Sequence, residues 1–478
     1  MKLSGQAMTE GFIAAIALAV LLLFIIAEVP IWVGLLSSGT IGLLLLDGFT
    51  LTVNALGTTA FSMVSSYSLF VIPMFILMGV LASNSGIAAD IFDVARRLTR
   101  RIPGGLGVAT ILAAGGFSAV TGSSGATVAT VGKIAVREMT RSGYKPNPSA
   151  ALVAAGGTLG VLIPPSIILV IYGSLTTQSI GTLLMSAVVP GLLTLFAYSI
   201  TVVVLFKAGK LTEPVSATAS VGHISAGSNS TPSSTSAAMG QSTMLATTAA
   251  TRTPISRRSL IGTAYTLLLF TIVIGGIYSG IFTATESGAI ASAAAVIILI
   301  IRIYRRGARG TLVGILDSLR EATSMSSMIF GLLIGGSVFS YFLVKSGLPS
   351  AAARMVTEAG LSSYALLGIA LLLMLILGFF LDSLSILVIA IPLMYPIVAA
   401  QGLDAIWFGI LTVKVIEIGL LTPPFGINVF VALGTSKLTS LEGIFKSVIP
   451  FIVTEAIVVV ILIAFPALTS FLPSLVGM

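Results

Sequence analysis

Long apolar runs recur along the 478-residue chain and are separated by short polar stretches. The runs at 11–27, 31–46 and 449–465 are each near the length of roughly 20 apolar residues with which a helix crosses the hydrocarbon core of a bilayer. The pattern predicts an all-α polytopic membrane protein whose main solvent is the lipid bilayer. The run 11–27 follows neither a basic segment nor a clear cleavage site, so we expect a retained first span rather than a signal peptide.

The order of these runs is repeated within the chain. Residues 160–165 (GVLIPP) reappear as 419–424 (GLLTPP), with an offset of 423 − 164 = 259 between the first prolines. Residues 85–87 (SGI) match 346–348 (SGL), with an offset of 346 − 85 = 261. A nearly constant offset over several elements indicates an internal repeat.

Each half is expected to contain the same series of elements. Two spans are followed by a short amphipathic stretch, a third span and a connecting arm helix. An apolar pair around a polar centre, a proline-interrupted span and a last span complete the series. In the first half these elements are 12–46, 49–62, 66–83, 87–101, 105–136, 148–174 and 182–206. In the second half they are 260–302, 311–323, 325–344, 349–359, 362–400, 405–433 and 446–470.

The apolar pair 105–136 is interpreted as a re-entrant hairpin, because both of its flanks are basic. The preceding cations are Arg96, Arg97, Arg100 and Arg101, and the following ones are Lys133, Arg137, Arg141 and Lys145. Loops rich in Lys and Arg stay in the cytoplasm, so both ends of the pair are expected on that side. Five crossing spans then remain in each half. Because five is odd, the second half is expected to be inverted relative to the first.

The second hairpin, 362–400, then opens to the outside and should lack basic flanks. Its surroundings are nearly balanced in charge, with Lys345, Arg354, Glu358 and Asp404. The linker between the halves is expected in the cytoplasm, and basic residues bound it at both ends: Lys207, Lys210, Arg252, Arg257 and Arg258. Both termini are then expected outside. The resulting regions are first-half scaffold and arm (11–104), first-half transport elements (105–206), linker (207–258), second-half scaffold and arm (259–361) and second-half transport elements (362–472).

The amino-acid composition argues against several other classes of function. Hydrophobic residues make up 56% and charged residues 8% of the chain, against about 25% charged residues in soluble domains. The net charge of +8 lies in loop clusters, so no nucleic-acid partner is expected. The chain has no Cys and a single His, His223, within the Ser- and Thr-rich stretch 211–253, which we expect to be a disordered tether. An enzyme working within the membrane is therefore not expected, and Gly125 to Lys133 has the wrong spacing for a nucleotide-binding loop.

Four polar interruptions at membrane depth form the candidate site. The hairpins turn at 121–127 (TGSSGAT) and 382–385 (DSLS), and the interrupted spans break within 156–166 and 419–428. Non-helical backbone survives at this depth only where protein or a watery cavity satisfies it. Since proline favours the first helical position, each Pro-Pro pair is expected to start a second half-helix with an anion-attracting N-terminus. Carbonyls of the preceding half-helix would suit sodium, the pattern of inverted-repeat transporters.

Two acidic residues leave alternatives open. Asp382 follows an apolar run, where an acid costs roughly 2.5–3.5 kcal/mol on insertion scales. It serves either as a cation ligand or as the N-cap of the returning hairpin helix. Glu417 either belongs to the site or pairs with Lys414. The Ser- and Gly-rich tip at 121–127 also has a purely structural interpretation, close packing of helices.

The runs 122–127, 156–166, 378–382 and 417–428 resemble the motifs of the large membrane subunit of TRAP transporters. The resemblance spans nearly the whole chain outside the linker. It implies a sodium-coupled importer of small organic acids, such as C4-dicarboxylates or sialic acid, in the cell inner membrane. It also implies an elevator mechanism and two partners, an extracytoplasmic substrate-binding protein and a small membrane subunit.

The motif positions of the family assign roles to individual residues. The sodium-binding residues implied by the resemblance are Ser123, Ser124, Gly160, Asp382, Ser383 and Thr422. The implied substrate contacts are Thr158, Pro165, Ser166 and Asn428. No organic cofactor is expected. The nearest rival is a stand-alone sodium/dicarboxylate or citrate-type symporter with the same inverted-hairpin plan.

The re-entrant fold of 105–136 predicts a labelling result. Because this chain has no native Cys, the single variants Ser142→Cys and Ile102→Cys each carry one thiol, one at each flank of the hairpin. We expect a membrane-impermeant maleimide to label both from the same face of oriented vesicles. Labelling from opposite faces would mean that the segment crosses the membrane.

Overall fold

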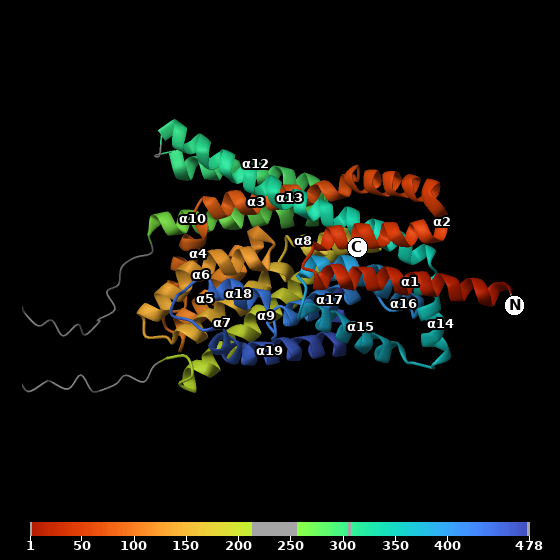
Figure 1. Ribbon diagram of the computed structural model, residues 1–478. Coiled ribbons are helices and arrows are strands. Elements are labelled where there is room, and N and C mark those ends of the chain that lie inside the picture. Colours follow the sequence, from red (N-terminus) through yellow and green to blue (C-terminus); the bar gives the residue numbers. More distant parts are fainter. Residues whose placement is uncertain (1, 213–255, 305–306, 476–478) are drawn as a thin grey trace, which may run out of the picture.

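The computed structural model describes residues 2–212, 256–304 and 307–475, and these residues form a bundle of helices (Figure 1). Eight helices of the described chain are long and apolar enough to cross a membrane. A ninth span results if the bent pair Pro146–Leu162 and Ile167–Thr176, which meet at 42°, is counted as one. The predicted all-α polytopic fold is confirmed.

The two halves contain similar series of elements. The first half consists of α1 (Lys2–Ile26), α2 (Ile31–Val64), η1 (Tyr67–Phe70), α3 (Val71–Asn84), α4 (Ile87–Leu98), α5 (Gly105–Thr121), α6 (Ser124–Arg141), α7 (Pro146–Leu162), α8 (Ile167–Thr176) and α9 (Ile180–Lys207). The second half consists of α10 (Arg257–Phe270), η2 (Thr271–Gly275), α11 (Gly276–Tyr278), α12 (Ala284–Ile303), α13 (Gly307–Lys345), α14 (Leu348–Glu358), α15 (Ser363–Gly378), α16 (Ser383–Ala400), α17 (Ala405–Gly419), α18 (Ile427–Leu433), α19 (Leu441–Ala464) and α20 (Ala467–Leu475).

Three element boundaries differ from the sequence-based expectation. The amphipathic stretch of the first half is continuous with α2, although the backbone leaves helical geometry at Gly48, where φ is +76°. In the second half, 311–323 and 325–344 form one helix, α13, because neither Pro nor Gly interrupts their junction. The last span, expected to reach residue 470, ends at Ala464. Phe465 precedes Pro466, and a residue before proline is disfavoured in helical geometry.

The proline pairs lie in the gaps of the broken spans rather than at the first helical position, so that expectation was wrong. Helix α7 ends at Leu162, and α8 begins at Ile167 with Ser166 as its N-cap. Ile163 is held in an extended conformation (ψ 116°), as expected for a residue directly before proline. In the second half the gap is longer, because α17 ends at Gly419 and α18 begins only at Ile427. Both Pro–Pro bonds are cis.

Helices from both halves form a separate layer along one side of the molecule. Figure 1 shows α2, α3, α12 and α13 side by side above the hairpins and broken spans. Glycines allow α2 and α13 to approach closely: a Cβ at Gly39 would lie 2.8 Å from the Cα of Phe339, and one at Gly335 would clash with the carbonyl oxygen of Trp32. Small residues at such contacts are typical of membrane helix pairs.

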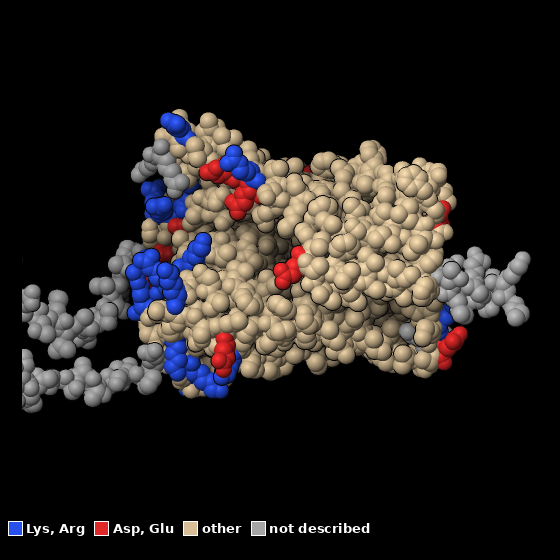
Figure 2. All heavy atoms as spheres, in the orientation of Figure 1, with Lys and Arg blue, Asp and Glu red and all other residues tan. Residues whose placement is uncertain are grey.

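The two arm helices lie toward opposite ends of the molecule. Figure 1 places α4 at one end and α14 at the other. Figure 2 shows that most Lys and Arg side chains on this face gather at the end that carries α4 and α10. This arrangement is the one expected of two inverted halves, and it puts the basic clusters at a single end. Which end faces the cytoplasm stays a prediction from the positive-inside rule.

The start of the linker is attached to the first half. Leu211 is buried, and its carbonyl oxygen accepts a hydrogen bond from the backbone N–H of Lys145 at 2.9 Å. Thr212 forms a β-bridge with Tyr144. The tether expected from residue 211 therefore begins no earlier than residue 213. Residues 213–255, including His223, lie outside the described residues.

The close contact between α2 and α13 predicts a packing defect. In Gly39→Leu, the new side chain meets the backbone of Phe339, so we expect the protein to lose about 1–3 kcal/mol of stability. Gly57→Leu is the matched control, since a Cβ at this position of α2 meets no atom within 4 Å. Thermal unfolding in detergent should separate the two variants. Equal melting temperatures would contradict the packing described here.

Candidate functional site

Both hairpins turn where one helix ends and a capped helix begins. Gly122 follows α5 with φ +60°, and a Cβ there would collide with the carbonyl oxygen of Pro165. Ser123 then caps α6, accepting a hydrogen bond from the N–H of Ala126 at 3.5 Å. Asp382 caps α16 in the second hairpin. Since 382 − 123 = 259, the two caps occupy equivalent positions of the repeat.

Each hairpin rests on the broken span of its own half at a glycine. A Cβ at Gly160 would lie 2.7 Å from the carbonyl oxygen of Ser123. A Cβ at Gly419 would lie 2.6 Å from the Cα of Gly378. Gly160 and Gly419 are also equivalent, because 419 − 160 = 259. The absence of a side chain at these positions allows backbone to meet backbone at the level of the breaks.

A cavity of about 190 Å³ lies between the two hairpin tips. The first turns of α6, α8 and α16 line it, and α18 begins at its wall. The lining residues are Gly122, Ser123, Ser124, Gly125, Ile167, Ile168, Met325, Met328, Ile329, Asp382, Ser383, Leu384, Leu420, Ile427 and Asn428. Helix N-termini carry unpaired N–H groups and a partial positive charge. Three helices of ten or more residues therefore direct positive ends at this cavity, which suits an anion.

A second cavity, of about 400 Å³, adjoins the first and shares Ser123, Ile167 and Met325 with it. It continues along α6 past Thr130 to Lys133, in the direction of the basic end of the molecule. Figure 2 shows a hollow near the middle of the molecular face. The second cavity therefore extends from the tips toward one end, which is the cytoplasmic end in the predicted orientation.

The structure brings four of the six predicted sodium residues to the wall of the central cavity: Ser123, Ser124, Asp382 and Ser383. Gly160 lies behind the wall, against Ser123. Thr422 lies away from the described wall, and its hydroxyl donates to the carbonyl oxygen of Ile418 at 2.7 Å. The sodium assignments of all six residues stay predictions.

Of the four predicted substrate contacts, the structure places only Asn428 on the described wall of the central cavity. Ser166 is buried and caps α8, where it accepts a hydrogen bond from the N–H of Leu169 at 3.3 Å. Pro165 is buried against the tip at Gly122. Thr158 is also buried, and its hydroxyl faces a polar network. Their substrate contacts stay predictions that require the cavity to change shape.

Asp382 is the N-cap of α16, so the capping alternative for this residue is confirmed. Its Oδ2 accepts hydrogen bonds from the N–H groups of Leu384 at 3.1 Å and Ser385 at 3.4 Å. Its Oδ1 accepts from the hydroxyl of Ser385. A carboxylate has about four lone-pair sites, so a cap on the cavity wall retains capacity for a cation. The two roles of Asp382 are compatible.

Glu417 is buried beside the second tip, and its predicted alternative partner was wrong. Its Oε1 accepts a hydrogen bond from the hydroxyl of Ser383 at 3.4 Å. Its Oε2 and the Nδ2 of Asn428 have no hydrogen-bond partner among the described residues. Lys414 pairs with Glu455 instead, because α17 packs against α19 at this level.

The pair of Lys414 and Glu455 is the centre of a buried network that the sequence-based assignment missed. Glu455 accepts hydrogen bonds from the hydroxyls of Tyr198 at 2.6 Å and Thr158 at 3.3 Å. Lys414 donates to the hydroxyl of Thr194 at 2.9 Å. The network joins α7 and α9 of the first half to α17 and α19 of the second. The available signal was an ionisable residue within each of two apolar helices, which is costly in a membrane without a partner.

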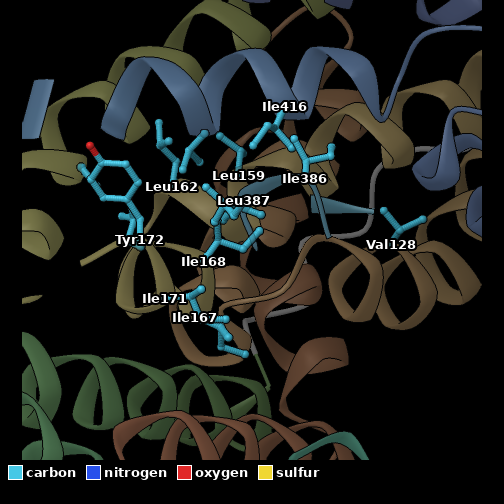
Figure 3. Packing of buried hydrophobic residues seen from close by; sticks show 14 of the residues in the cluster. Val128, Leu159, Leu162, Ile167, Ile168, Ile171, Tyr172, Ile386, Leu387 and Ile416 are labelled. Atoms are coloured by element: carbon cyan, nitrogen blue, oxygen red, sulfur yellow. The ribbon is translucent and has the colours of Figure 1, made fainter. Parts of the chain in front are cut away.

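The helices that line or support the central cavity pack against one another through apolar side chains. Figure 3 shows buried side chains that include Leu159, Ile168, Leu387 and Ile416 packing together. They come from α7, α8, α16 and α17, so the broken spans of both halves share one core with the second hairpin. Ile168 also lines the cavity. The cavity wall is therefore continuous with a well-packed interior.

A membrane-spanning helical fold with paired polar hairpin tips over a central cavity defines a transport protein. The family model for the DctM component of the tripartite ATP-independent periplasmic transporters matches residues 17–468. The chain therefore belongs to the family of TRAP transporter large permease subunits, which are transport proteins and not enzymes.

Curated relatives match over most of their length. The C4-dicarboxylate TRAP transporter large permease protein DctM of Pseudomonas aeruginosa is 34% identical over 429 residues, which cover 89% of this chain and 91% of the relative. The sialic acid TRAP transporter large permease protein SiaM of Vibrio cholerae is 29% identical over 458 residues, 93% of this chain and 97% of the relative. Among solved structures, the YdaH transporter of Alcanivorax borkumensis, described as having an unusual topology, has a similar fold. Its TM-score is 0.60 at 12% identity, over 88% of this chain and 90% of that chain.

The buried pair predicts a strong effect on stability. Lys414→Met leaves the carboxylate of Glu455 buried without its cation, so we expect a loss of about 3–5 kcal/mol. The double variant Lys414→Met/Glu455→Leu removes both charges and should regain most of that loss. Lys446→Met is the control, because its partner Glu442 lies on the exposed surface of the same helix, α19. Thermal unfolding in detergent provides the measurement, and a double variant no more stable than the single one would contradict the pairing.

The glycine contacts at the hairpin tips predict a loss of transport without loss of the fold. Gly160→Ala places a methyl group against the carbonyl of Ser123 and should displace the first tip from the broken span. Gly368→Ala adds the same methyl group in α15, where no atom lies within 4 Å and outside the described wall of the central cavity, and should transport normally. Uptake in proteoliposomes compares them. Equal transport rates would show that the contact at Gly160 is not needed.

Proposed function

We propose that this chain is the substrate-translocating subunit of a sodium-coupled, binding-protein-dependent importer of small organic acids in the cell inner membrane. The observation that carries the proposal is the cavity between the hairpin tips, toward which α6, α8 and α16 direct their N-termini. The helix dipoles, together with the N–H groups that the caps Ser123, Ser166 and Asp382 leave unbonded, favour a carboxylate there. The relatives named above are a C4-dicarboxylate and a sialic acid permease protein, and both of those substrates are carboxylates.

Oxygen atoms on the same wall support the proposal of sodium coupling. Ser123, Ser124 and Ser383 supply hydroxyls, and Asp382 supplies a carboxylate. Hard oxygen ligands of this kind suit a sodium ion. A cation beside Asp382 would offset the negative charge that the substrate brings into the membrane interior. Binding of the ion and of the anion would then favour each other, which is the thermodynamic basis of symport.

An elevator movement is the mechanism that we propose for transport. The glycine contacts join each hairpin to its broken span. The hydrogen bonds of Lys414 and Glu455 to first-half hydroxyls join the two halves, so these elements can move as one body. On the opposite wall of the cavity, α13 presents Met325, Met328 and Ile329. Methionine is flexible and adapts to changing neighbours. We propose that the body slides along this surface, guided by the arms α4 and α14.

Two partners complete the proposal, an extracytoplasmic substrate-binding protein and a small membrane subunit. The description of the matched family as tripartite supports both. The rival function, a stand-alone symporter, requires neither partner. Reconstituted vesicles decide between the two: uptake that needs added binding protein supports the proposal, and equal uptake without it supports the rival.

The charge of Asp382 provides the direct test of sodium coupling. Asn caps helices about as well as Asp, so Asp382→Asn keeps the hairpin and removes only the charge. We expect the sodium concentration for half-maximal uptake to rise about tenfold or more, since a unit charge near 4 Å contributes several kcal/mol even at an effective dielectric constant of about 20.

Asp404→Asn is the matched control for this variant. Asp404 also caps a helix of the second half, accepting from the N–H of Trp407 at 2.6 Å, but it lies outside the described wall of the central cavity. It should leave sodium dependence unchanged. Uptake by Asp382→Asn with the sodium dependence of the parent protein would remove Asp382 from the ion site.

A further inference from the structure

A groove of about 640 Å³ lies at the basic end of the molecule, away from the cavity between the tips. The first three turns of α10 form one wall and the end of α12 forms the other. Its lining residues are Arg257, Arg258, Ile261, Tyr265, Ile301, Arg302, Ile303 and Tyr304. Three of the eight are arginines, and none is acidic.

Arg302 is a fixed part of this groove. Its side chain is only 9% exposed and forms an ion pair with Asp90 of α4. Its Nε donates to the carbonyl oxygen of Ser85 at 3.2 Å. Gly262 allows α10 to approach Asp90 at the same point, because any Cβ there would clash with the carboxylate. The floor of the groove is therefore built by contacts among α4, α10 and α12.

No ion pair within the described residues neutralises the other two arginines. Arg257 and Arg258 are exposed, and neither forms an ion pair within the part of the chain that the structure describes. The nearby acids are already engaged: Asp90 pairs with Arg302, and Asp93 pairs with Arg97 and accepts a hydrogen bond from Ser259 at 2.8 Å. Within the described residues, the groove thus presents to an anion two arginines that have no ion-pair partner.

Apolar and amphipathic side chains continue the groove toward the membrane. Ile261 is 40% exposed and Ile301 is 48% exposed. Ile261 lies in the candidate span Arg257–Tyr278, which begins with α10, and Ile301 lies in α12, which is long and apolar enough to cross the bilayer. Tyr265 and Tyr304 line the same groove, and tyrosines are enriched where a membrane helix meets the headgroup level. Charge thus lies beside a hydrocarbon-facing surface.

We propose that this groove binds the headgroup of an anionic phospholipid, with the phosphate at Arg257 and Arg258 and the acyl chains along Ile261 and Ile301. Basic grooves between membrane helices on the cytoplasmic side bind such headgroups. A soluble phosphate would not contact the exposed isoleucines, whereas a phospholipid would contact both them and the arginines. The lipid is therefore the occupant that matches the whole lining. Because α10 packs against the arm α4, the lipid would hold this corner of the scaffold at a fixed depth in the membrane.

The test compares lipid retention by the full chain and two double variants. Arg257→Gln/Arg258→Gln removes two charges from the groove and leaves the pair of Arg302 and Asp90 intact. Arg100→Gln/Arg101→Gln removes two exposed charges from the same end but outside the groove. Each protein, in detergent, is titrated with phosphatidylglycerol or with phosphatidylcholine, and native mass spectrometry measures the bound lipid.

We expect the groove variant to bind phosphatidylglycerol about tenfold more weakly or worse, because each basic residue near an anionic headgroup contributes substantially. The control variant should bind phosphatidylglycerol as tightly as the parent. The binding of phosphatidylcholine should not differ among the three proteins. Equal retention of phosphatidylglycerol by the parent and the groove variant would overturn the proposal. So would equal competition by free glycerol phosphate, which would identify the ligand as a soluble anion. Melting temperatures of the lipid-free proteins check that both variants are folded.

Discussion

Backbone amide and carbonyl groups without helical partners must form hydrogen bonds inside the protein or with water in a cavity, because the hydrocarbon of the bilayer has no hydrogen-bonding groups. The described part of the chain has four such places, two hairpin tips and two broken spans, and the structure brings them together around one cavity. Glycines at 160 and 419 permit the contact, and the exposed helix N-termini turn toward a shared cavity. The site therefore exists because the non-helical segments of the tips and the broken spans pack against one another. Helices that remained unbroken would leave no place for an ion or a substrate.

A second constraint holds this centre in place. Lys414 and Glu455 are charged, buried and drawn from two helices of the second half, and their hydrogen bonds reach Thr158, Thr194 and Tyr198 of the first. Burying an ion pair costs desolvation free energy, but burying either charge without its partner destabilises the fold more. Each charge therefore requires the other. The halves thus meet through a polar network as well as through the apolar core in Figure 3. In the proposed mechanism, this network would keep both tips moving together.

Much of the architecture was predictable, because apolar run length and a constant repeat offset are properties of the sequence alone. The hairpin tips, the breaks and the cap at Asp382 were located from Gly, Pro and Asp. The proline pairs were misplaced at helix starts, since their position in the gap depends on the extended residue before them. Which hydroxyls reach the cavity and which face Glu455 depends on helix rotation and packing, and no local motif encodes these. Thr158 and Ser166 illustrate that limit.

We propose that both hairpin tips and the start of α8 build one site for an organic anion. A density map of the protein reconstituted with sodium and a bromine-labelled dicarboxylate measures this most directly. We expect bromine density between the two tips, in contact with the first turns of α6 and α16. Density confined to the second cavity near Lys133, with none between the tips, would contradict this proposal.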